Sequence, residues 1–87
     1  MTSVLIRLNT ANDVKDFVDI ASGYCFKINL CCEKYVVNAK SIIGIFSLDL
    51  TKNIELDAEV DENSKFFEDI KKYIVDWVVF TTQFYII

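Results

Sequence analysis

Residues 38–50 read Asn-Ala-Lys-Ser-Ile-Ile-Gly-Ile-Phe-Ser-Leu-Asp-Leu, and this stretch is the most informative part of the sequence for predicting the fold. Serine is a favoured capping residue, so we expect Ser41 to begin a short helix over residues 42–48. Four bulky apolar side chains crowd this helix, and a short helix cannot bury them all. We therefore expect half of the cluster in the core and the remainder at the surface. Its members are Ile42, Ile43, Ile45 and Phe46.

The segments on either side alternate between strand and helix patterns. Apolar and acidic residues alternate after residue 53, which predicts a strand with one buried face. Further on, an apolar stripe predicts a long helix that carries Phe66, Phe67, Ile70, Tyr73, Ile74 and Trp77 on one face. The expected elements, in chain order, are a strand over 4–8, a helix over 13–22 capped by Asn12 or Asp13, hairpin strands over 26–30 and 35–37, the short helix, a strand over 54–60 and the long helix, capped by Asp61.

This order, β-α-β-β-α-β-α, defines the fold class. The connections are too short for repeated parallel crossovers, so the strands are expected to form an antiparallel sheet. The chain is therefore predicted to be an α+β open-faced sandwich, with a four-stranded antiparallel sheet and three helices on one face.

The composition indicates one globular domain without a basic surface. The chain has 87 residues, of which 53% are hydrophobic, and a formal charge of −4. This acidic balance argues against nucleic acid or an anionic membrane as a partner. Cys25, Cys31 and Cys32 lack the spacing of a disulfide framework and favour reduced thiols in a cytoplasmic protein. Without histidine or a Cys-x-x-Cys pair, no metal site is expected, and no cofactor either.

The sequence over residues 4–74 resembles HPr, the small phosphocarrier of the bacterial sugar phosphotransferase system. The most specific match is the run 40–44, Lys-Ser-Ile-Ile-Gly, followed by Ser47-Leu48. Weaker matches support it at the end of the first helix, on the second strand and at the start of the last helix. They are Ala21-Ser22, Ile28-Asn29-Leu30 and Asp61-Glu62-Asn63. The resemblance implies the HPr-like sandwich that the element order predicts.

The active-site motif of that family, Gly-x-His-x-Arg-Pro, is not kept. Counting back from Ala21-Ser22 without gaps, Thr10 takes the place of the histidine, Asn12 that of the arginine and Asp13 that of the proline. A threonine phosphoester is far more inert than a phosphorylated imidazole and would trap the phosphoryl group. The arginine that would pair with the phosphoryl oxygens is also missing. The resemblance therefore implies an HPr-like protein without phosphocarrier activity.

The resemblance also places Ser41 at the regulatory serine of the family, which the HPr kinase phosphorylates in many Gram-positive bacteria. A phosphate there would lie near the N-terminus of the short helix, with Lys40 adjacent. The alternative interpretation is that Ser41 only caps the helix. The family docks its kinase and a transcriptional regulator on the neighbouring apolar cluster, so Lys40, Ile42, Ile43, Ile45 and Phe46 are candidate docking residues.

The end of the chain departs from the family pattern. We expect an HPr-like domain over residues 1–76 and an apolar extension over residues 77–87. The extension is too short to span a bilayer, which takes about 20 residues. It could pack on its own domain, or it could bind a partner or a second copy through Trp77, Phe80, Phe84 and Tyr85.

Three functions stay open at this stage. The first is a regulatory protein-interaction module controlled at Ser41. The second is a dimeric or partner-bound structural module that uses the extension. The third is a divergent phosphocarrier that uses Thr10 or Ser41. An enzyme is not expected, because the chain has no histidine and no glycine-rich phosphate loop.

Overall fold

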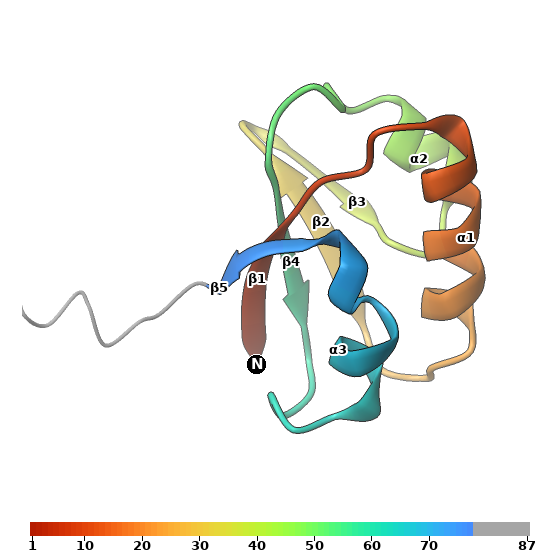
Figure 1. The fold of residues 1–87 in the computed structure, drawn as a ribbon. Helices are drawn as coiled ribbons and strands as arrows, with labels where there is room; N and C mark the ends of the chain where they lie inside the picture. The colour runs from red at the N-terminus through yellow and green to blue at the C-terminus, as the bar shows by residue number, and fades with distance from the viewer. Residues whose placement is uncertain (78–87) are drawn as a thin grey trace, which may run out of the picture.

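Each strand of the sheet runs antiparallel to its neighbours, and the helices lie together on one face (Figure 1). The structure is a computed structural model that describes residues 1–77. The strand order across the sheet is β3-β2-β4-β1-β5. The elements are β1 (Thr2–Ile6), α1 (Ala11–Ser22), β2 (Ile28–Cys32), β3 (Tyr35–Asn38), α2 (Ile42–Phe46), β4 (Ile54–Ala58), α3 (Lys65–Asp69), the 3-10 turn η1 (Lys71–Tyr73) and β5 (Ile74–Trp77).

The core lies between the helices and one face of the sheet. Buried and partly exposed residues alternate along β2 and β4, as expected for strands with one covered face. Helix α1 buries Val14, Phe17 and Ala21, which are spaced along one face of the helix. Phe17 meets Tyr73 edge to face, with ring centroids 6.0 Å apart, and this contact joins α1 to the chain just before β5.

The predicted α+β sandwich is confirmed, with five strands in place of four. The hairpin turn lies at Glu33 and Lys34, between the two expected hairpin strands, and Glu33 has a φ of 57° in the left-handed region. Helix α1 begins two residues earlier than expected, and its cap is Thr10 rather than Asn12 or Asp13. Ser64, not Asp61, caps the third helix.

The long last helix was the main error of the sequence prediction. Helix α3 ends at Asp69, and the chain then passes through η1 into β5, which adds a strand beside β1. The physical reason is the run of β-branched and aromatic residues that starts at Ile74, which favours a strand over a helix. The spacing of Tyr73, Ile74 and Trp77 fits one face of a helix as well, so periodicity alone gave the wrong element.

Candidate functional site

The first candidate site is the N-terminus of α1, which a capping box closes. The Thr10 hydroxyl accepts a hydrogen bond from the backbone N–H of Asp13 at 3.0 Å. In return, Oδ2 of Asp13 accepts from the backbone N–H groups of Asn9, at 3.0 Å, and Thr10, at 3.3 Å. The Asp13 carboxylate therefore takes up N–H groups at the helix start that could otherwise hold an anion.

The side chains at this helix start include a hydroxyl, an amide and a carboxylate, with no imidazole and no guanidinium among residues 9–13. Thr10 and Asn12 are both exposed, so access does not limit them. The hydroxyl of Thr10 is already a hydrogen-bond acceptor in the cap, and the negative charge of Asp13 lies where an incoming phosphoryl group would need positive partners. The arrangement stabilises the start of the helix.

The second candidate site is Ser41, which begins α2 as predicted. Its side chain accepts a hydrogen bond from the backbone N–H of Gly44 at 3.2 Å, and the residue is exposed. The helix ends at Phe46, two residues earlier than expected. A Cβ on Gly44 would lie only 3.3 Å from Cβ of Val37 and 3.2 Å from Oγ of Ser41, so glycine lets α2 approach β3 closely. Ser41 thus has an accessible hydroxyl on a short helix held tightly against the sheet.

Lys40 has a structural contact as well as a place next to Ser41. Its Nζ donates hydrogen bonds to the carbonyl oxygens of Tyr24, at 2.6 Å, and Phe26, at 3.1 Å. Tyr24 in turn donates from its hydroxyl to Asp69 at the end of α3. The hydrogen bond to Asp69 raises the pKa of the Tyr24 hydroxyl, and desolvation of the hydroxyl and the negative charge of Asp69 raise it further. Lys40 therefore ties the start of α2 to the loop between α1 and β2.

The apolar cluster around Ser41 divides between core and surface, but one of its four residues is buried rather than the expected half. Ile45 is fully buried, whereas Ile42, Ile43 and Phe46 are 37%, 80% and 48% exposed. Helix α2 contacts both α1 and β3, and Figure 1 shows it beside the end of α1 at which the chain enters that helix. The exposed apolar residues, Ser41 and the capping box of α1 therefore belong to one end of the molecule.

A polar cluster that the sequence analysis missed lies on the uncovered face of the sheet. The Ser3 hydroxyl donates to Asp57 at 2.5 Å, and the Cys31 thiol lies 3.5 Å from the other oxygen of that carboxylate. Partial burial and Asp57 raise the pKa of Cys31 to about 11. Glu55 shares a hydrogen bond with Asp57, which raises the pKa of Glu55. The strand alternation places these residues on one face, but their pairing depends on the register between β1, β2 and β4.

Several other expectations concern what the described chain contains. Within residues 1–77, no group of three His, Cys, Asp or Glu side chains could hold a metal ion. No helix in this part of the chain has the length and hydrophobicity needed to cross a membrane.

Trp77 ends β5 opposite Val4, and its ring centroid lies 5.4 Å from that of Phe67. Phe80, Phe84 and Tyr85, also expected to bind a partner, lie outside the described residues, and the division after residue 76 stays a prediction.

Comparisons with known proteins assign this chain to a family. The chain matches the family model described as "PTS HPr component phosphorylation site" over residues 10–76. Among solved structures it is similar to HPr-C-His from Thermoanaerobacter tengcongensis, with 29% sequence identity, a TM-score of 0.69, and coverage of 83% of this chain and 89% of the other. The search of curated proteins finds no match.

The fold is that of a small α+β phosphotransferase-system domain, and the family match begins at Thr10, the cap of α1. The chain belongs to the HPr family. Proteins of this family are phosphocarriers that interact with other proteins of the phosphotransferase system, so protein partners are the class of ligand to consider.

Proposed function

We propose that this chain is an HPr family member that does not carry phosphoryl groups and acts as a regulatory protein-interaction module. The observation that carries this proposal is the capping box at the N-terminus of α1. The Thr10 hydroxyl and the Asp13 carboxylate each accept a hydrogen bond from the other residue's backbone N–H. The resemblance to HPr places the histidine of the family at Thr10. A cap of this kind holds the helix start but offers no nitrogen nucleophile to a phosphoryl donor.

The charge of α1 supports the same proposal. Asp13, Asp16 and Asp19 repeat along the helix, and Lys15 is the one cation between them. Asp16 and Asp19 are exposed. The resemblance implies that HPr docks its phosphotransferase partners through an arginine on this helix surface. An acidic surface in its place disfavours partners that match a positive one.

Control of the module is proposed to act at Ser41. The hydroxyl is exposed, and three large apolar side chains of α2 are exposed next to it. Phosphorylation would add up to two negative charges beside this apolar surface and would replace the hydroxyl that accepts from Gly44. Such a change alters which proteins can bind the surface, which is how a serine switch works without any catalysis by this chain.

Incubation with HPr kinase and ATP tests this proposal. We expect incorporation of one phosphate, loss of incorporation in Ser41→Ala, and normal incorporation in Ser47→Ala. Ser47 is the matched control because it is exposed and ends the same helix. Ile43→Ala should slow the reaction without unfolding the protein, because that side chain is 80% exposed. Absence of incorporation under conditions that modify an ordinary HPr would reduce Ser41 to a helix cap.

A further inference from the structure

The sheet has two edges in the described residues, and both are open to pairing. There, β3 and β5 each have one neighbouring strand, so each presents unpaired backbone N–H and C=O groups. Lysines are a common protection against edge-to-edge pairing. Lys34 directly precedes β3, and Lys71 and Lys72 precede β5, so flanking charge does not distinguish the two edges. What distinguishes the β5 edge is the groove beside it.

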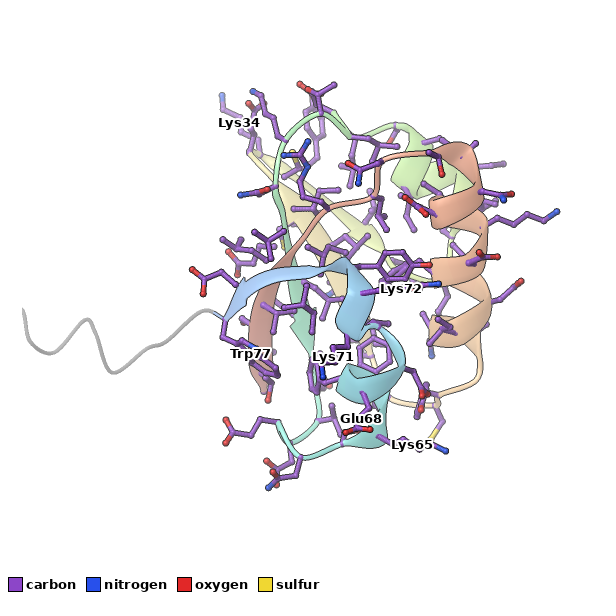
Figure 2. All side chains as sticks on the ribbon, in the orientation of Figure 1. Lys34, Lys65, Glu68, Lys71, Lys72 and Trp77 are labelled. Carbon is purple, nitrogen blue, oxygen red and sulfur yellow. The ribbon has the colours of Figure 1, made fainter. Side chains whose placement is uncertain are left out.

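Large apolar side chains accompany this open edge. Val75 is 54% exposed and Trp77 is 43% exposed. A groove of about 570 Å³ runs along the strand on the helix side, and the aromatic rings of Phe67 and Trp77 form part of its wall. Figure 2 shows Glu68 and Lys71, which also line the groove, on the same side of the molecule as Trp77. The edge thus offers backbone hydrogen-bond groups beside an apolar hollow, which is the geometry that receives an added strand.

The sequence that follows β5 indicates what could pair there. Residues 77–87 contain no charged residue, so continued pairing would bring no like charges together. The last ten residues also contain no Gly, Pro, Asn or Asp, the residues that tight reverse turns prefer. A sharp return of this segment along its own strand therefore lacks the usual turn chemistry. Seven of these ten residues are hydrophobic, namely Val78, Val79, Phe80, Phe84, Tyr85, Ile86 and Ile87.

We propose that the β5 edge is a homodimer interface, in which β5 of two copies pair antiparallel across a two-fold axis and join the two sheets into one. Antiparallel pairing of a strand with itself is self-complementary and closes after two copies. β5 has four residues and cannot alone bury the roughly 1,200 Å² of a stable interface, so the groove beside the strand has to contribute to the contact. The proposal does not depend on phosphorylation of Ser41, because β5 and α2 are separate parts of the surface.

Two matched variants test the proposal in the full chain. Sedimentation equilibrium at about 100 µM should give twice the chain mass of 10.0 kDa. Val75→Lys on β5 should raise the dissociation constant at least tenfold, because it places a charge in the paired edge. Val36→Lys on β3 changes a valine of similar exposure, 63%, at the opposite edge and should leave the dissociation constant within about twofold. A monomeric wild type, or equal effects of the two variants, would overturn the proposal.

Trp77 gives a second measurement that needs no variant. It is the single tryptophan of the chain and lies in β5. If β5 is in the interface, its fluorescence should shift to longer wavelength over the dilution range in which the mass falls to that of the monomer. An emission spectrum that stays constant while the dimer dissociates would place the interface elsewhere and refute pairing through β5.

Discussion

Replacing Asp13 with alanine should destabilise the protein by about 1 to 2 kcal/mol. The substitution removes the carboxylate that accepts from the backbone N–H groups of Asn9 and Thr10. Loss of a capping side chain costs about 1 kcal/mol, within a range of about 0.5–2 kcal/mol. Loss of a negative charge near a helix N-terminus adds about 0.3–1 kcal/mol. Asp13→Asn keeps an acceptor but loses the charge, so its effect should be smaller.

The control for this experiment is Asp16→Ala. Asp16 lies on the same helix and is exposed, and alanine raises helix propensity at both positions. The difference between the two variants therefore isolates the cap. Urea unfolding at pH 7, followed by far-UV circular dichroism, measures both free energies of unfolding. The order of stability should be Asp16→Ala, then Asp13→Asn, then Asp13→Ala. If Asp13→Ala is as stable as Asp16→Ala, the carboxylate does not close the helix start and the argument from the capping box fails.

Three further predictions follow from burial and from the polar cluster of the sheet. Ile45→Ala should lower the free energy of unfolding by about 2–5 kcal/mol because Ile45 is fully buried, and Ile43→Ala should lower it by less than about 0.5 kcal/mol because Ile43 is exposed. Equal losses in urea unfolding would contradict the assignment of Ile45 to the core and of Ile43 to the surface. Iodoacetamide at pH 8 should modify Cys25 first, because Cys25 is exposed, whereas Cys32 is buried and the pKa of Cys31 is raised to about 11. Peptide mass spectrometry at early times measures the order of modification, and a Cys31 that reacts as fast as Cys25 would contradict the raised pKa. Glu55→Gln should stabilise the protein at pH 7, because the Asp57 hydrogen bond, partial burial and the Asp57 charge raise the pKa of Glu55, so that ionisation above that pKa costs stability. The free energy of unfolding of the wild type should therefore fall relative to that of the variant as the pH rises through the Glu55 titration. Parallel curves of stability against pH would refute this.

The sequence predicted most of the fold because its patterns each allow one local structure. The alternation around Leu30 and Leu56 fixes which face of β2 and β4 is buried, since a shift by one residue would reverse both faces. Ser41 was correctly predicted as a cap, because few residue types can accept the orphan N–H groups of a helix. These features are local, so a sequence read residue by residue contains them.

The errors arose where two local structures fit the same residues. The stripe from Tyr73 to Trp77 fits a helix by spacing and a strand by residue type, and the free edge of β1 decides the outcome by pairing with β5. At the start of α1, Thr10, Asn12 and Asp13 are all residue types that cap helices, and the reciprocal bond with Asp13 selects Thr10. Both decisions depend on partners that the local pattern does not name.

The candidate sites were predictable to a different degree. The position of Ser41 as the cap of α2 followed from the sequence, whereas that of Thr10 as the cap of α1 did not. The division of the apolar cluster was predicted, but not that three of its four residues are exposed. The double hydrogen bond from Lys40 to the carbonyls of Tyr24 and Phe26 did not, because it joins segments 14 and 16 residues apart through one flexible side chain. The groove beside β5 could not be expected either while that segment was taken for a helix.

Incubation with enzyme I is the most direct test of the proposal that this chain does not carry phosphoryl groups. The full chain is incubated with enzyme I and phosphoenolpyruvate, beside an ordinary HPr as positive control, and acid-labile phosphate is measured. We expect no acid-labile phosphate on this chain, because the chain contains no histidine and the Thr10–Asp13 cap closes the start of α1. A stoichiometric amount of acid-labile phosphate on this chain would contradict the proposal and show that the chain is a phosphocarrier.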